Sequence, residues 1–344
     1  MPSEFLRECL SRLVRHDDLT RAEASRLLET LLSDEATEAQ IAAVLIALAA
    51  KGETVDELAG MASALRARAV RVDACHDCFI DTAGTGSSKA KTFNISTAAA
   101  FVIAGAGLPV AKHGNRAASS RSGSADVLTA LGVNVSAAPI LSESCLNEIG
   151  ICFMFAPLYH GATARVAGVR RELGVQTSFN LLGPLSNPAR APRQIIGVWR
   201  KDLVEQLANA LSLLGTSRAW VVHGEDGLDE ITTDGKTSVA EARDGVVTTF
   251  EISAGDFDQP AGTLEHLRGG DPGMNAKIIR QVLSGTRKDE ARTLVVINAA
   301  AALFVGGLDD DLRSAARHAE ESIDSGAAAD KLDQLIRATN SGLR

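Results

Sequence analysis

Short β-favouring runs alternate with helix-favouring stretches from residue 78 onward, and this alternation constrains the fold more than any other feature of the chain. The apolar, β-favouring runs occupy residues 79–80, 108–111, 194–199 and 218–222. Stretches rich in Ala and Leu lie between them, at residues 96–106, 124–131 and 203–214. Strands that alternate with helices predict an α/β domain with a mostly parallel central sheet.

The segment before residue 74 carries only helical signals. Capping boxes, in which a Thr precedes a Glu or Gln by three positions, begin at Thr20, Thr37 and Thr54,. Each precedes an apolar helical pattern, and Gly52 is suited to end the second helix,. Residues 163–191 are also helical, and we expect them to pack with these helices. The predicted domains are therefore a small helical domain at 1–73, with a contribution from about 163–191, and an α/β domain at 74–162 and 192–344.

Charge and hydropathy exclude several classes of protein. A net charge of −8 and a pI of about 5.5 argue against a general nucleic-acid binder,. The longest apolar runs, 41–50 and 98–111, are shorter than the ~18 residues that cross a bilayer,. Cys75 and Cys78 form a lone C-x-x-C that lacks the second ligand pair of a zinc site,. We expect a cytoplasmic protein with no nucleic-acid partner and no membrane partner.

The segment 81–97 has the design of a phosphate-binding loop. It reads DTAGTGSSK at 81–89 and TFNIST at 92–97, between a predicted strand and an Ala-rich helix. A glycine turn lets the backbone approach an anion, and the start of a helix favours negative charge. An ordinary capped strand–turn–helix junction would look similar. A P-loop is excluded because Ala90 precedes Lys91, and a dinucleotide fingerprint because Lys89 replaces its third glycine,.

A second polar loop and an acidic turn strengthen this interpretation. Residues 112–124 read KHGNRAASSRSGS, which crowds anion donors after another predicted strand,. Parallel α/β sheets place such loops together at the carboxyl ends of their strands. Asp229 and Glu230 are either an exposed acidic turn or, beside phosphate loops, carboxylates suited to Mg²⁺,. Arg170, on a predicted helix, is either a surface ion-pair residue or a fork for a substrate carboxylate,.

These segments resemble a known series of motifs. The residues at 92–97, 112–116, 180–185 (NLLGPL) and 223–230 (HGEDGLDE) are similar, in order and spacing, to those of the anthranilate phosphoribosyltransferase family. Tail segments at 269–272 (GGDP) and 298–303 (NAAAAL) fit as well, so the resemblance covers roughly residues 10–340. It implies the nucleoside-phosphorylase-like fold of the class IV phosphoribosyltransferases, with a helical domain hinged to an α/β domain. It also implies a homodimer and a transferase of tryptophan biosynthesis that moves the phosphoribosyl group of PRPP (phosphoribosyl pyrophosphate) to the amine of anthranilate.

The resemblance also implies roles for individual residues, none of them as a general acid or base. The residues implied to bind PRPP are Gly84, Thr85, Gly86, Ser87, Ser88, Thr92, Asn94, Ile95, Ser96, Thr97, Lys112, Gly114, Asn115, Arg116, Ser119, Ser120 and Ser124. Those implied to bind anthranilate or line its path are Gly84, His113, Asn115, Ala156, Pro157, His160, Arg170 and Gly183. Ser96, Asp229 and Glu230 would hold magnesium, as a pair of ions bound with PRPP.

Two departures from the family pattern keep alternatives open. The family's first loop usually reads Gly-Thr-Gly-Gly-Asp-Gly, whereas Ser87 and Ser88 follow Gly86 here, and Gly161 replaces the proline that usually follows His160. A paralogue that ribosylates a different aromatic amine therefore remains possible. A pyrimidine-nucleoside phosphorylase needs no acidic pair, so Asp229 and Glu230 argue against it. A nucleic-acid-binding paralogue should have lost the acceptor and metal residues and gained a basic face.

Overall fold

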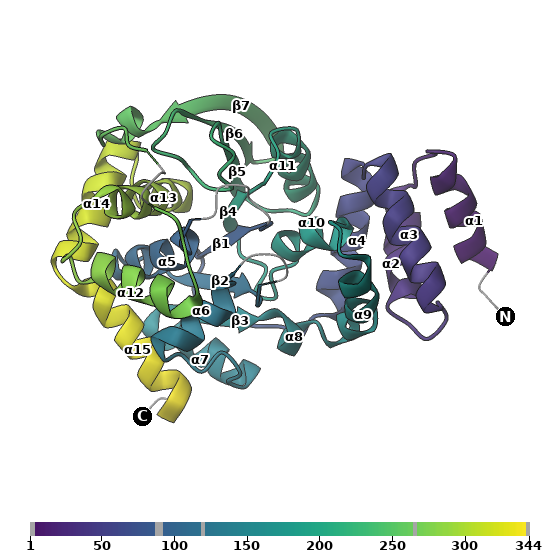
Figure 1. The fold of residues 1–344 in the computed structure, drawn as a ribbon, viewed down its shortest axis with the longest axis horizontal. Helices are drawn as coiled ribbons and strands as arrows, with labels where there is room; N and C mark the ends of the chain where they lie inside the picture. The colour runs from purple at the N-terminus through teal and green to yellow at the C-terminus, as the bar shows by residue number, and fades with distance from the viewer. Residues whose placement is uncertain (1–3, 87–91, 118–120, 264–266, 342–344) are drawn as a thin grey trace.

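The chain folds into a helical domain beside a larger α/β domain (Figure 1), and this confirms the expected fold class. The structure is a computed structural model, and it describes residues 4–86, 92–117, 121–263 and 267–341. The helical domain begins with α1 (Glu4–Val14), α2 (Arg21–Leu31), α3 (Glu38–Lys51) and α4 (Val55–Arg68). None of the helices among the described residues is both long enough and apolar enough to span a membrane.

Local sequence signals account for the boundaries of the first helices. At Thr20, Thr37 and Thr54 the hydroxyl accepts a hydrogen bond from the third helical amide, and the third side chain bonds back to the cap residue. These are the three predicted capping boxes. Gly52 ends α3 with φ 84°, a conformation that glycine adopts without strain,.

Two later helices complete the helical domain. These are α9 (Ala164–Leu173) and α10 (Ser178–Leu185), which follow β3 and precede β4 in the chain. Buried side chains of α9 and α10, such as Val166 and Leu182, share one apolar core with α1–α4. The chain therefore leaves the α/β domain and returns to it between residues 155 and 193.

The sheet has seven strands in the order β3-β2-β1-β4-β5-β6-β7. The strands are β1 (Ile80–Gly84), β2 (Val110–Gly114), β3 (Ile151–Phe155), β4 (Arg193–Gly197), β5 (Arg218–Gly224), β6 (Lys236–Arg243) and β7 (Val246–Ser253). Neighbouring strands from β3 to β5 run parallel, whereas β6 and β7 form an antiparallel hairpin at one edge. The order reverses at β1, because β2 follows on one side and β4 on the other. Such a switch point opens a crevice at the carboxyl ends of the strands.

Helices cover both faces of the sheet. The main core joins β1–β3 to α5 (Ile95–Gly105) and α6 (Ser124–Leu131), and to the later helices. These are α7 (Pro139–Ile149), α12 (Pro272–Leu283), α13 (Glu290–Gly306), α14 (Leu312–Asp324) and α15 (Ala327–Ser341). The other core joins β4–β6 to α11 (Leu203–Leu213) and continues into the helical domain. The interface between the two domains is thus buried and apolar beside α11. The crevice at the switch point opens near this interface.

Candidate active site

Two glycines at the switch point make room for the acidic turn. Gly84 ends β1, Gly197 ends β4, and the two residues are paired in the sheet. A Cβ atom on Gly197 would lie 1.6 Å from the backbone oxygen of Asp229, and one on Gly84 would lie 3.5 Å from Asp229 Oδ2. The predicted acidic turn therefore lies directly against the ends of the two central strands.

The second acidic residue contacts the start of α5. Glu230 Oε1 accepts a hydrogen bond of 3.2 Å from the backbone N–H of Ser96. Burial, and then the Asp229 carboxylate, raise the pKa of Glu230 to about 8. Both acidic residues are half-buried, which rules out a freely exposed turn. A pair of crowded carboxylates favours a cation, while the helix start beside them favours an anion.

Lys112 brings a buried positive charge to the same place. Its side chain is buried in the middle of β2, and its ammonium donates to the backbone oxygen of Thr82. Lys112 Nζ also lies 3.3 Å from Thr82 Oγ1 and 3.5 Å from Ser96 Oγ. Burial lowers the pKa of Lys112, and the carboxylates of Asp81 and Glu230 oppose that shift. The ammonium of Lys112, the first turn of α5 and the carboxylates of Asp229 and Glu230 therefore lie close together.

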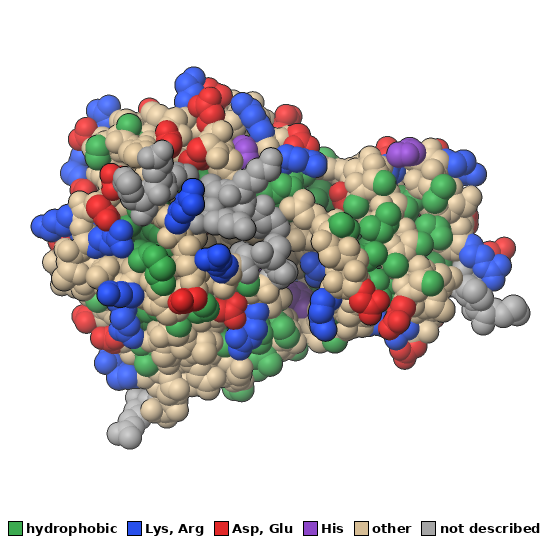
Figure 2. All heavy atoms as spheres, viewed as in Figure 1, with side chains coloured by type: hydrophobic (Ala, Val, Ile, Leu, Met, Phe, Trp, Pro, Cys, Tyr) green, Lys and Arg blue, Asp and Glu red, His purple; other side chains and the backbone are tan. Residues whose placement is uncertain are grey.

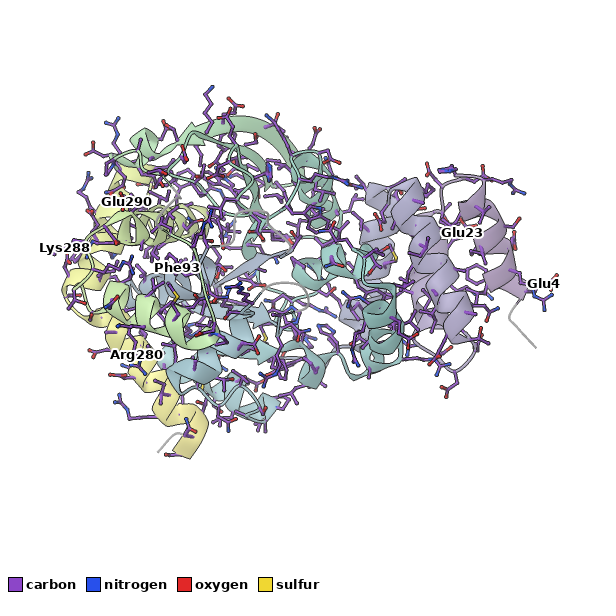
Figure 3. The ribbon with its side chains drawn as sticks, in the orientation of Figure 1. Glu4, Glu23, Phe93, Arg280, Lys288 and Glu290 are labelled. Carbon is purple, nitrogen blue, oxygen red and sulfur yellow. The ribbon has the colours of Figure 1, made fainter. Side chains whose placement is uncertain are left out.

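The described part of the first loop is held by residues 268–275, which include the tail motif. Thr92 forms an isolated antiparallel bridge with Arg268, and a Cβ atom on Gly269 would lie 2.2 Å from the backbone oxygen of Thr92. Asn94 Oδ1 accepts 3.0 Å from Asn275 Nδ2 of α12. Phe93, between them, is buried in the main core beside α5 (Figure 3). Ser87 and Ser88, which complete the loop, lie outside the described residues.

The second loop is closed by a carboxylate that our sequence analysis did not assign to the site. Asp126 Oδ2 accepts from the backbone N–H groups of Ala117 at 2.9 Å and Gly123 at 3.0 Å. Its other oxygen accepts 2.8 Å from Arg116 Nη1, and Ser124 Oγ donates 3.3 Å to the backbone oxygen of Asn115. The predicted residues Ser119 and Ser120 lie outside the described residues. An Asp at the third position of a helix, where its carboxylate can accept from the backbone N–H of the N-cap residue, is the signal that could have revealed this contact,.

Two buried histidines lie together on the side of the site nearest α10. The rings of His113, on β2, and His160, after β3, are 5.1 Å apart and T-shaped. His113 Nδ1 lies 3.2 Å from the backbone oxygen of Gly183 in α10. Burial lowers the pKa of His113 to about 3 and that of His160 to about 4, so both rings are neutral near pH 7. His113 Nε2 is buried without a hydrogen-bond partner among the described residues, which suits it to a polar group of a ligand,.

The remaining predicted acceptor residues lie on helices that follow β3. Ala156 and Pro157 begin α8 (Ala156–Tyr159), the short helix that leads to His160. Arg170 lies in α9, with its guanidinium carbon 5.1 Å from the ring centroid of Phe179. Burial lowers the pKa of Arg170, and within the described ranges it forms no ion pair. A desolvated guanidinium without a carboxylate favours binding of an anion.

Some predicted residues are buried or are held by other contacts. The side chains of Ile95 and Thr97 are buried in the first turn of α5, and the backbone N–H of Ile95 donates 2.8 Å to the backbone oxygen of Phe93. Thr85 donates its backbone N–H, at 2.9 Å, to the backbone oxygen of Gly197. On the face drawn in Figure 2, Lys and Arg side chains are scattered over both domains, and some of them lie where the two domains meet. Cys75 is exposed and Cys78 half-buried, and neither belongs to a metal-binding cluster within the described ranges.

Comparison with known proteins identifies both domains. Residues 7–69 match the helical bundle domain of a glycosyl transferase family, and residues 76–329 match its a/b domain. The chain is 50% identical over 334 residues to the anthranilate phosphoribosyltransferase of Desulfosudis oleivorans, covering 97% of this chain and 98% of the relative. It is 52% identical over 335 residues to that of Anaeromyxobacter dehalogenans, covering 97% of this chain and 99% of the relative.

Solved structures of similar chains have the same fold. The enzyme of that name from Thermus thermophilus superposes with a TM-score of 0.91 at 37% identity, over 97% of this chain and 99% of its own. The yeast enzyme in complex with PRPP and Mg superposes with a TM-score of 0.89 at 28% identity, over 98% of this chain and 99% of its own. A further yeast structure holds 4-fluoroanthranilate, at a TM-score of 0.87 and 27% identity, with coverage of 98% for both chains.

Proposed function

Since this chain belongs to the anthranilate phosphoribosyltransferase family, we propose that the crevice at the switch point of its sheet is where the family's reaction takes place. The chain is a glycosyltransferase that moves the phosphoribosyl group of PRPP to the amine of anthranilate. The products are N-(5-phosphoribosyl)anthranilate and pyrophosphate, in a step of tryptophan biosynthesis. The observation that carries the location is the meeting of Lys112, the start of α5 and the Asp229–Glu230 turn at the ends of β1 and β4.

The PRPP site comprises the turn after β1, the first turn of α5 and the loop after β2. Gly84 and Gly86 allow close approach of the backbone, and Gly86 has φ 65°,. The positive end of the α5 helix dipole and the ammonium of Lys112 attract phosphate oxygens. Ser87, Ser88, Ser119 and Ser120 remain predictions for this site.

Asp229 and Glu230, with the hydroxyl of Ser96, would hold magnesium. Mg²⁺ prefers one or two carboxylates and completes its shell with water and substrate phosphate oxygens. The carboxylate pair fits this preference, because Asp229 lies close enough to raise the pKa of Glu230, and a cation between the two carboxylates would relieve their repulsion,. When bound, the ion neutralises charge on the pyrophosphate group, and a pair of ions is proposed for each site.

Substitution at the anomeric carbon requires positioning and electrostatics more than proton transfer. The C–O bond to pyrophosphate breaks as the ribose gains oxocarbenium character, and the anthranilate nitrogen forms the new bond. Lys112 and the start of α5 hold negative charge on the leaving group. An aromatic amine is mostly unprotonated at neutral pH, so it can attack without a general base, and after the new bond forms its proton passes to water or to the departing pyrophosphate. The neutral rings of His113 and His160 serve to shape the acceptor path.

The acceptor site lies between β2, β3 and the returning helices α9 and α10. Arg170 would form a charge-assisted fork with the carboxylate of anthranilate. Asn115, Ala156, Pro157 and Gly183 would line the path together with the histidines. Arg170 is desolvated and forms no ion pair with any other described residue, which supports this role.

We also propose that the chain is a cytoplasmic homodimer. Large apolar side chains are exposed on the helical domain, with 66% of Val14 and 40% of Ile46 accessible. Figure 2 shows green side chains gathered over that domain on the face drawn. The domain boundaries at 73–74, 162–163 and 191–192 are proposals too, supported by the shared core of α9, α10 and the N-terminal helices. Light scattering of the purified protein at several concentrations tests the dimer.

An assay with PRPP, Mg²⁺ and anthranilate, following the loss of anthranilate fluorescence, tests the proposed function. Asp229→Asn and Glu230→Gln should each abolish most of kcat and leave the Tm nearly unchanged. A severe drop in Tm would instead assign the pair a structural role. Binding of PRPP without turnover of anthranilate would favour the alternative in which another aromatic amine is the acceptor.

A further inference from the structure

Helix α13 contacts the residue that follows the acidic pair. We propose that Asn298, in the middle of this helix, is a positioning residue that fixes the acidic turn in its metal-binding arrangement. The proposal rests on the proposed function, because it assigns a role toward the ion that Asp229 and Glu230 would hold.

The side-chain amide of Asn298 clamps the residue that follows the acidic pair. Asn298 Oδ1 accepts 3.0 Å from the backbone N–H of Ile231, and Asn298 Nδ2 donates 2.9 Å to the backbone oxygen of Ile231. The same Nδ2 donates 2.8 Å to the backbone oxygen of Leu294, one turn earlier in α13. Asn298 is 4% exposed and Ile231 is fully buried. These bonds fix the orientation of the amide and hold both backbone polar groups of one residue.

Asn298 is a polar side chain in the middle of an apolar part of α13. From Leu294 to Phe304, Asn298 is the one polar side chain of α13, and this stretch packs in the main core. A buried amide is costly unless it is hydrogen-bonded. Both of its bonds outside α13 go to Ile231, so the helix places its single polar group where it fixes the backbone next to Glu230.

The acidic turn is thereby confined on two sides. On one side Gly197 leaves no space between β4 and the backbone oxygen of Asp229. On the other side Asn298 holds Ile231, while Asp226 Oδ1 accepts 3.0 Å from the backbone N–H of Leu228 at the start of the turn. Residues that orient metal ligands through hydrogen bonds commonly change metal affinity when they are replaced.

Asn275, in α12, uses its side-chain amide in the same way beside the first loop. Asn275 Oδ1 accepts 2.8 Å from the backbone N–H of Gly270, and Asn275 Nδ2 donates 3.0 Å to Asn94. The two helices α12 and α13 thus support the two sides of the crevice, and Asn298 is the one that supports the metal side.

The test compares Asn298→Ala with a matched control, Ser322→Ala. Ser322 is also buried, and its hydroxyl donates 2.8 Å to the backbone oxygen of Val102 in α5, away from the acidic turn. Differential scanning fluorimetry with PRPP and increasing Mg²⁺, without anthranilate, gives the Mg²⁺ concentration at half of the rise in Tm. Initial rates give the Mg²⁺ dependence of turnover independently.

For Asn298→Ala we expect the Mg²⁺ midpoint to increase about 10- to 100-fold, with part of kcat recovered at high Mg²⁺. Ser322→Ala should lower the Tm without shifting the midpoint. An unshifted midpoint in Asn298→Ala would overturn the positioning role, whatever its Tm. If Asn298→Ala does not fold, Asn298→Ser, whose hydroxyl can bond back to Leu294, replaces it under the same criterion. A wild-type protein without any Mg²⁺-dependent rise would instead overturn the magnesium site itself, and the role with it.

Discussion

Replacing Gly197 by alanine should misplace the acidic turn and slow the reaction strongly. The new Cβ atom would lie 1.6 Å from the backbone oxygen of Asp229, whereas real Cβ contacts essentially never fall below 3.0 Å. Strand β4 and the turn must therefore move apart by at least 1.4 Å, the difference of these distances. Since a misplacement of about 1 Å can cost 10²-fold in rate, we expect kcat/KM to fall at least about 100-fold, or about 2.7 kcal/mol.

Gly60→Ala is the matched control for the clash. Its Cβ atom would lie 2.2 Å from the backbone oxygen of Arg21, where α4 crosses α2 in the helical domain. Both variants should lower the Tm, which differential scanning fluorimetry measures. Steady-state rates, corrected for the folded fraction, should fall only in Gly197→Ala. A Gly197→Ala protein with wild-type kcat/KM would refute the argument that this glycine positions the acidic turn.

Three further predictions concern the acceptor, the acid stability and the second loop. Arg170→Ala should raise the KM for anthranilate about 10- to 100-fold, which corresponds to one lost charge-assisted hydrogen bond, and should leave the KM for PRPP nearly unchanged. The control Arg171→Ala, at an exposed position, should leave both KM values nearly unchanged. Equal changes of both KM values in Arg170→Ala would contradict the assignment. As the pH falls from about 6.5 to about 4, the two histidines bind protons in the unfolded chain, whereas His113 and His160 stay neutral in the folded protein because burial lowers their pKa values,. The Tm should therefore decrease over this pH range, and it should decrease less in His160→Gln. An equally steep decrease in His160→Gln would count against burial of a neutral ring. Asp126→Asn weakens the bonds that close the second loop and should raise the KM for PRPP about tenfold,; steady-state kinetics with an unaltered KM would show that the loop closes without the carboxylate.

Features with local signals could be predicted from the sequence. The capping boxes placed α2, α3 and α4, and the alternation of short apolar runs with helices predicted the parallel sheet. Strand β3 and the hairpin β6–β7 were not predicted. A short apolar run such as Ile151–Phe155 fits a buried helix as well as a strand, and β6 contains Lys, Ala, Glu and Arg, which favour helices,.

The proximity of the motif loops could be predicted from the topology of the sheet, whereas the contacts that hold these loops in place could not. Parallel strands bring their carboxyl ends to one edge, so the loops after β1, β2 and β5 meet whatever their distance in the chain. The contacts of Gly197 with Asp229, and of Asn298 with Ile231, depend on packing between segments that share no sequence pattern. Only a three-dimensional structure relates such residues to the site.

The return of the chain to the helical domain has a consequence for folding during synthesis. The core that buries α3 and α4 also requires α9 and α10, and the central strand β1 pairs with β4, which is made later still. A nascent chain that ends before residue 185 therefore exposes apolar helix faces and unpaired strand edges at the same time. Contacts so distant along the chain form slowly, and such intermediates tend to aggregate. We expect the emerging polypeptide to depend on protection by chaperones until β4 has left the ribosome.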